Sequence, residues 1–330
     1  MLQSNIPMID LHLHLRGTIS PGIAARLAAR NRCKIADGIV GRDGKFAWNG
    51  FPQFLEIYAK VGQLVRCADD LRFLAEEWLV LAAEEGTIYV ELMLSPLHVQ
   101  RAGIGVREQI SAVSAGIEAA RSRCGIEAKI VATAVRHHGP AEAEALAEYL
   151  SEAKPAEVTG FGLTGDEHKY AAADFRRAFQ IAANSGLGLT AHTGEWRGPR
   201  DMMNTVETLG LARVGHGIRA VEDEGVLREL KGRGVGWEVC ISSNLALRLG
   251  SRAKTHPITG LIASGCSVAL GTDDPGFFDT TLGREYLLAN TRFGVSEDRI
   301  LKITRDAVNM AFCSGRTKAK LLRLVPPFDS

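Results

Sequence analysis

Short apolar runs alternate with longer amphipathic stretches along almost the whole chain. The short runs have the length of buried strands, and the longer stretches repeat apolar positions at helical spacing. The predicted strands are residues 8–14, 87–94, 127–134, 158–163, 187–192, 213–216, 236–239 and 267–270. The helices predicted between them include residues 71–85, 106–123, 141–153, 171–185, 200–209, 223–233 and 257–264. Regular alternation implies parallel strands with crossover connections, and eight such units in 330 residues favour an α/β fold closed into a (β/α)8 TIM barrel.

Two segments depart from this alternation. Residues 31–52 carry many glycines and charged residues and follow the first strand and its helix, so we interpret them as an insertion over the barrel mouth and a possible lid. From Leu282 onward the pattern stays helical without further strands, which predicts extra helices around the base or side of the barrel. No repeat or linker divides the chain, and residues 1–330 are expected to form a single domain. Four apolar side chains just after the insertion have helical spacing and are expected to pack in the core rather than line a pocket: Phe51, Phe54, Leu55 and Tyr58.

The composition carries no strong electrostatic signature. Hydrophobic residues make up 46% of the chain, enough for a large core, and 39 basic against 38 acidic residues give a formal net charge of +1. This balance does not favour nucleic acid or an anionic membrane surface as partner, so a small molecule is expected. The six cysteines lie far apart with no Cys-x-x-Cys pair, which indicates reduced thiols. With no signal peptide and no apolar run long enough to span a membrane, the expected location is the cytoplasm.

Histidines and an aspartate gather at the ends of the predicted strands. His12 and His14 stand one residue apart in the first strand, so their side chains share a face and can bind one metal ion. His192 ends the fifth strand, His216 ends the sixth, and Asp273 follows the eighth. In a barrel these strand ends meet at one mouth, where such folds place their active sites. Three histidines and a carboxylate there suit Zn²⁺ with a position left for water, whose pKa the ion would lower to near neutrality.

Five short motifs follow one another between about residues 8 and 290. They are His-Leu-His at 12–14, Gly-Asp-Glu at 165–167, His-Thr-Gly-Glu at 192–195, Gly-His-Gly at 215–217 and Thr-Asp-Asp-Pro at 272–275. Their combination resembles the adenosine deaminase family of the amidohydrolase superfamily. The resemblance implies a (β/α)8 barrel with one zinc ion that hydrolyses a 6-aminopurine to the 6-oxo compound and ammonia. It also implies that the zinc ligands are His12, His14, His192 and Asp273.

The resemblance further implies a role for each residue around the ion. Glu195 would lie against ring N1 and donate a proton as hydroxide adds to C6, and His216 would orient or deprotonate the attacking water. Asp273 would take part in catalysis as well as in metal binding. Asp274 would face N7, and the backbone N–H of Gly165 would face N3. The chemistry requires such an acid, because addition to an aromatic carbon builds negative charge on a ring nitrogen.

Arg16 departs from the pattern of the family. It stands where nucleoside deaminases of this family usually carry an aspartate positioned for a ribose hydroxyl. A guanidinium there could pair with a carboxylate or phosphate of the substrate, or with an internal acidic residue, and the sequence leaves both open.

This departure widens the expected substrates. Adenosine or deoxyadenosine is the default of the family, with adenine, aminodeoxyfutalosine or an acid-bearing aminated heterocycle recognised by Arg16 as alternatives. A hypothesis of another class is a protein that keeps its metal but only binds its ligand.

Overall fold

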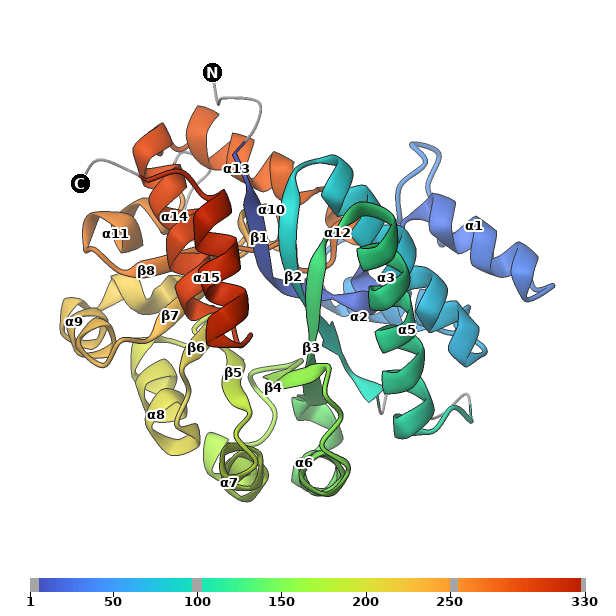
Figure 1. Cartoon of the computed structure of the whole chain (residues 1–330), viewed down its shortest axis with the longest axis horizontal. Coiled ribbons are helices and arrows are strands. Elements are labelled where there is room, and N and C mark those ends of the chain that lie inside the picture. Colours follow the sequence, from blue (N-terminus) through green and yellow to red (C-terminus); the bar gives the residue numbers. More distant parts are fainter. Residues whose placement is uncertain (1–5, 97–102, 250–254, 328–330) are drawn as a thin grey trace.

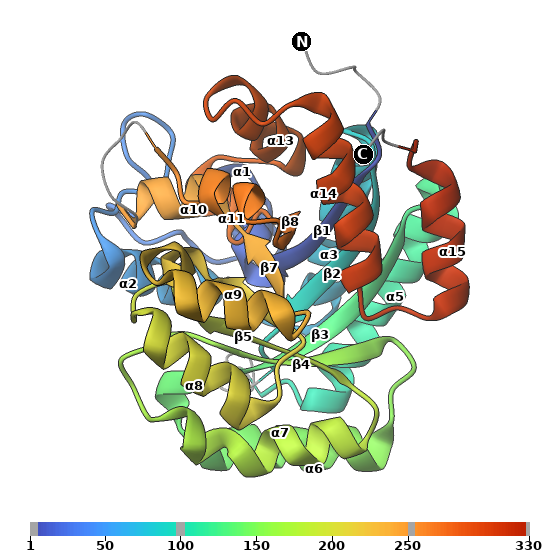
Figure 2. The same cartoon turned by 90° about the vertical axis from the view of Figure 1, so that its left-hand side faces the viewer.

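Eight parallel strands follow one another around the sheet in chain order (Figures 1 and 2). The computed structural model describes residues 6–96, 103–249 and 255–327. The ring closes where β1 meets β8, because the His14 N–H donates to the Asp273 carbonyl (2.9 Å) and the Asp273 N–H donates to the His12 carbonyl (2.8 Å). The predicted (β/α)8 barrel is therefore confirmed. Its strands are β1 (Met8–His14), β2 (Thr87–Leu94), β3 (Glu127–Val135), β4 (Val158–Thr164), β5 (Gly188–Thr193), β6 (Arg213–His216), β7 (Gly236–Val239) and β8 (Ser267–Leu270).

Helices alternate with the strands, and most begin and end within a few residues of the predicted bounds. The predicted helix at 71–85 begins earlier, because the Asp70 carboxylate accepts the backbone N–H groups of Arg66 and Cys67 at its first turn. The predicted helix at 171–185 is divided into a 3-10 turn (Ala172–Phe175) and α7. The helices up to β8 are α1 (Pro21–Arg30), α2 (Phe51–Gly62), α3 (Ala68–Glu84), α5 (Val106–Cys124), α6 (Pro140–Ala153), α7 (Arg176–Asn184), α8 (Pro199–Leu209), α9 (Glu224–Gly232), α10 (Ile241–Ala246) and α11 (Ile258–Ala263).

The C-terminal helices pack against the barrel as the sequence predicts. After the short α12 (Pro275–Phe278) the chain forms α13 (Leu282–Thr291), α14 (Glu297–Met310) and α15 (Gly315–Leu324), drawn in orange and red (Figure 1). Inside the barrel, Arg213 of β6 donates to the Met310 carbonyl (2.8 Å), and its guanidinium lies 3.5 Å from the centre of the Phe312 ring. The N-terminal ends of the strands are closed in this way, which leaves the opposite ends for a site.

The segment 31–52 runs from the end of α1 into the first two residues of α2, and before α2 it has little regular structure apart from a bridge between Val40 and Phe46. Side chains connect it to α12 and the residue that follows it: the Phe46 ring lies 4.6 Å from that of Phe277, and Lys45 Nζ lies 2.9 Å from Asp279 Oδ2. These contacts place the segment beside the strand ends that carry the site. Its role as a lid stays a prediction.

Two expectations about the whole chain can be compared with the structure. All six cysteines are free thiols. Within the described ranges, no helix combines the length and the hydrophobicity needed to span a bilayer.

Candidate active site

Four side chains predicted to bind metal meet at the carboxyl ends of the barrel strands. His12 and His14 come from β1, His192 comes from β5, and Asp273 follows β8; all four are buried, and their nearest ligand atoms lie within 4.8 Å of one another. His14 Nε2 lies 3.2 Å from His192 Nε2 and 3.3 Å from Asp273 Oδ1. His12 Nε2 lies 3.6 Å from the same carboxylate oxygen. The structure therefore brings the four residues into one cluster.

The cluster fits a single metal ion. Ligand atoms about 2.0–2.1 Å from a tetrahedral zinc ion are about 3.4 Å from one another, close to the separations observed here. His12 Nε2 is buried without a hydrogen-bond partner. Burial alone would lower the pKa of His12, but the carboxylates of Asp273 and Glu238 raise it to about 10. The surroundings of this nitrogen thus favour a positive charge, which a bound cation would supply.

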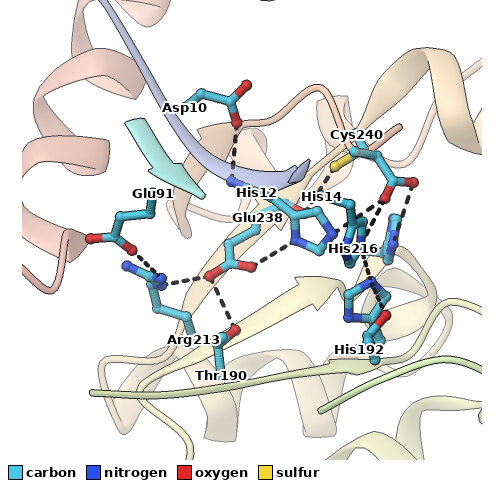
Figure 3. A network of polar contacts seen from close by, with 12 residues as sticks. Asp10, His12, His14, Glu91, Thr190, His192, Arg213, His216, Glu238 and Cys240 are labelled. Carbon is cyan, nitrogen blue, oxygen red and sulfur yellow. Dashed lines mark hydrogen bonds and ion pairs between the residues drawn. The ribbon is translucent and has the colours of Figure 1, made fainter. Parts of the chain in front are cut away.

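A buried ion-pair network orients His12 from inside the barrel (Figure 3). Glu238 Oε2 lies 2.8 Å from His12 Nδ1, which places the ring hydrogen on Nδ1 and leaves Nε2 free for a metal. The other oxygen of Glu238 binds Arg213, and Arg213 also binds Glu91 of β2 (2.6 Å). This network was not predicted from the sequence, although Glu91, Arg213 and Glu238 stand out as charged residues inside short apolar strands.

Glu195 lies in the loop between β5 and α8 and faces the cluster. Its carboxyl group is buried, and burial followed by the charges of Asp273 and Glu167 raises its pKa well above the usual range, which favours the protonated form. Glu167 holds the loop in place, because its carboxylate accepts the backbone N–H groups of residues 194–197, with distances of 2.8 Å to Gly194 and 3.1 Å to Glu195. Glu167 belongs to the Gly-Asp-Glu motif at 165–167, but the motif by itself predicted no separate role for this residue.

His216 ends β6 beside the cluster. Its Nε2 lies 3.8 Å from Glu195 Oε1 and 4.0 Å from Asp273 Oδ2, and its Nδ1 lies 3.2 Å from Asn244 Nδ2. Burial lowers the pKa of His216 to about 3, so the ring is neutral. His216 and Asp273 both have a φ of +60°, a left-handed conformation that is uncommon outside glycine and gathers at functional sites.

The cluster opens into a cavity of about 930 Å³. Side chains of α2 line one wall, so the expectation that this helix face packs only in the core was wrong: Phe54 is buried in the core, and it also borders the cavity together with Phe51, Leu55 and Tyr58. A helix face can serve both purposes when it bridges the core and the barrel mouth. His12 is fully buried and does not line the cavity, and the other predicted site residues line it: His14, Arg16, Gly165, His192, Glu195, His216, Asp273 and Asp274.

Arg16 is a buried cation on the cavity wall. It donates through Nη2 to the Tyr58 carbonyl (3.2 Å), and its Nε has no hydrogen-bond partner. A Cβ at Gly62 would lie 1.5 Å from Nη2, so the guanidinium occupies its observed position next to a glycine and would have to move if that residue had a side chain. In the described parts of the chain no carboxylate forms an ion pair with Arg16 within 4.0 Å, although burial lowers the pKa of Arg16 and the charge of Asp274 acts on the guanidinium to raise it.

Asp274 lies on the same wall. Burial, and then the charge of Asp273, raises its pKa well above the usual range, while its Oδ1 has no hydrogen-bond partner. Burial and the neighbouring charge thus favour the protonated form of Asp274, which is a hydrogen-bond donor.

Known proteins match nearly the whole chain. The family model described as adenosine deaminase matches residues 7–327. An adenine deaminase of Rhizobium rhizogenes is 40% identical over 321 residues, which cover 97% of this chain and 99% of that protein. The crystal structure of an adenine deaminase from Arthrobacter aurescens superposes with a TM-score of 0.91 at 25% identity, covering 97% of this chain and 98% of that one. An amidohydrolase from Burkholderia ambifaria with bound Zn has a TM-score of 0.87 at 25% identity, covering 96% and 89%.

Proposed function

The chain belongs to the adenosine deaminase family, and from this premise we propose that it is a zinc-dependent adenine deaminase that releases hypoxanthine and ammonia. It is an enzyme that hydrolytically deaminates a 6-aminopurine, so the hypothesis of a protein that only binds its ligand is not supported. The observation that carries the proposal is the meeting, at one cavity, of four side chains that can bind a metal with the buried carboxyl of Glu195, whose pKa is raised. The similar proteins favour adenine, one of the alternatives from the sequence, over the default of adenosine.

Zinc is the metal that suits the cluster. Three imidazole nitrogens and one carboxylate oxygen form a donor set that zinc commonly takes, and one similar structure contains Zn. When bound, the ion would lower the pKa of a water molecule and so make hydroxide available near neutral pH.

Glu195 supplies the proton that makes the addition possible. As the C6–O bond forms, the electron pair of the C6–N1 double bond takes the proton of Glu195 at N1. The proton lost by the attacking water passes to a base, either Asp273 or His216, and from there to the amino group. The bond between C6 and the protonated amino nitrogen then breaks, and ammonia leaves. The new hydroxyl returns its proton to Glu195, so the product keeps hydrogen at N1 and the acid is restored.

Asp274 and Gly165 orient the ring in this scheme. The protonated Asp274 carboxyl would donate to N7, which has a lone pair in the plane of the purine. The Gly165 N–H, in the loop after β4, would donate to N3. Together the two donors would turn C6 toward the metal ligands and N1 toward Glu195.

An ammonia-release assay tests the function. The zinc-loaded chain should deaminate adenine faster than adenosine, and Glu195→Gln should lower kcat by at least about 10²-fold while keeping its zinc, because the amide cannot donate an acidic proton. Failure of the wild-type enzyme to release ammonia from any 6-aminopurine would contradict the proposal. A clear preference for adenosine would contradict the choice of adenine alone.

Arg16 supports a second candidate, a 6-aminopurine that carries a carboxylate or phosphate. A buried guanidinium without an ion-pair partner is costly unless an anion approaches it, and a cavity of about 930 Å³ holds molecules much larger than a free base. If this substrate is used, Arg16→Gln should raise KM for the anionic compound at least tenfold and leave KM for adenine nearly unchanged. Equal effects on both compounds would remove this candidate.

A further inference from the structure

A line of hydrogen-bonding groups runs behind His216, away from the cavity. At the start of α11, the Ile258 backbone N–H donates to His256 Nδ1 (3.1 Å). His256 Nε2 lies 3.3 Å from Asn244 Oδ1, and Asn244 Nδ2 lies 3.2 Å from His216 Nδ1. All four residues are fully or almost fully buried, so water does not compete for these contacts.

The Ile258 N–H determines which atom donates and which accepts in each hydrogen bond of this chain of residues. A backbone N–H can only donate, so His256 Nδ1 must accept and cannot carry hydrogen. Burial lowers the pKa of His256 to about 4, and the neutral ring then carries its hydrogen on Nε2. This N–H faces the oxygen of the Asn244 amide, which turns the NH₂ of the amide toward His216. His216 Nδ1 must therefore accept as well.

We propose that Asn244 and His256 are positioning residues that hold the hydrogen of His216 on Nε2, the nitrogen that faces the reacting groups. The carboxylate of Asp273 lies on the Nε2 side of the ring, with Oδ2 at 4.0 Å, so a hydrogen on Nε2 would face an acceptor. The inference rests on the proposed function and decides a question that it left open. A nitrogen that already carries hydrogen cannot take the proton of the attacking water. His216 therefore donates a hydrogen bond to the attacking oxygen, and the Asp273 carboxylate is the base.

The two positioning residues do not act on the substrate directly. Neither Asn244 nor His256 lines the cavity, while His216 does. A change in either residue can reach the reaction only through His216 or through the stability of the fold, and an experiment can separate these two routes.

The first test measures by NMR which ring nitrogen of His216 carries the hydrogen. In the zinc-loaded wild-type enzyme labelled with ¹⁵N-histidine, the ring nitrogens of His216, assigned by the loss of its signals in His216→Gln, should show a bare Nδ1 and a hydrogen-bearing Nε2. A bare Nε2, or hydrogen on both nitrogens at neutral pH, would overturn the proposal. Because the spectrum needs no turnover, it stays decisive if the enzyme proves inactive on adenine. Lack of ammonia release in the assay above would instead count against the proposed function.

The second test changes the direction of the hydrogen bond between residue 244 and His216 by mutation. Asn244→Asp keeps the size of the side chain but offers only acceptor oxygens, which should draw the hydrogen of His216 to Nδ1. We expect the ¹⁵N spectrum of His216 to show hydrogen on Nδ1 and a bare Nε2, the reverse of the wild type. We also expect kcat to fall at least about 10²-fold and KM to change by less than about threefold. Asn290→Asp is the matched control, because the Asn290 amide donates to a backbone carbonyl (Val295, 2.8 Å) and Asn290 does not line the cavity. It should be less stable yet keep kcat.

Two results would contradict the proposal even if the wild-type spectrum shows the hydrogen of His216 on Nε2. One is an Asn244→Asp enzyme that folds, binds zinc and keeps its kcat. The other is a loss of kcat in Asn244→Asp while the hydrogen of His216 stays on Nε2. Should Asn244→Asp fail to fold, the wild-type spectrum alone decides.

Discussion

Replacing Glu238 with glutamine should weaken metal binding through a residue that never touches the metal. Glu238 Oε2 accepts hydrogen from His12 Nδ1 at 2.8 Å, and its other oxygen binds Arg213. Removing the carboxylate charge makes His12 a weaker ligand, and losses of such partners typically cost about 10–100-fold in metal affinity, or about 1.4–2.7 kcal/mol. The same change leaves the buried Arg213 with one carboxylate instead of two. Because breaking a buried pair typically costs about 3–5 kcal/mol, the metal-free protein should also lose stability on this scale.

Glu91→Gln separates these two effects. Glu91 pairs with the same guanidinium (2.6 Å), and none of its contacts in the described chain is to His12. This variant should therefore lose similar stability in urea unfolding of the metal-free protein, while its zinc affinity, measured by competition with a chromophoric chelator, stays within about twofold of wild type. The reasoning would be refuted if both variants lowered zinc affinity equally, or if Glu238→Gln did not lower it.

Further predictions concern the loop of Glu195 and the response to acid. Glu167→Gln removes the negative charge that binds four backbone N–H groups of the loop that carries Glu195. Steady-state kinetics should therefore show at least a tenfold lower kcat at unchanged zinc content. An unchanged kcat would mean that the position of Glu195 does not depend on the Glu167 carboxylate. His256 should make the fold sensitive to acid: its pKa falls from 6.5 to about 4 on folding, so the unfolded chain binds more protons in this range, and stability that is fully present above pH 6.5 is lost as pH falls toward 4. The loss is about 3 kcal/mol. Urea unfolding of wild type and His256→Asn across this range should show the steeper decline in wild type, and parallel declines would contradict the assignment.

The barrel and the metal cluster could be predicted from the sequence because both follow from local patterns. Each strand is a short apolar run bounded by turns, and the order of strand and helix leaves few alternatives for the sheet. His12, His14, His192 and Asp273 stand at strand ends, and the closure of a barrel is enough to bring strand ends together.

The parts that escaped prediction depend on which surfaces meet in three dimensions. Glu91, Arg213 and Glu238 belong to three different strands and become neighbours only inside the closed barrel. The apolar spacing of α2 predicts a buried face, but it does not tell whether Phe54 and Tyr58 meet the core, the cavity or both. The orientation of His216 depends on Asn244 and His256, whose contacts cross from α10 to the start of α11.

The most direct test of the whole account is to locate the metal. Crystals of the purified enzyme grown with zinc should give anomalous difference maps, from data collected on both sides of the zinc absorption edge, with one strong peak per chain about 2.0–2.2 Å from His12 Nε2, His14 Nε2, His192 Nε2 and an Asp273 carboxylate oxygen. The absence of a peak among these four atoms, or a zinc ion bound by other residues of the cavity, would contradict it.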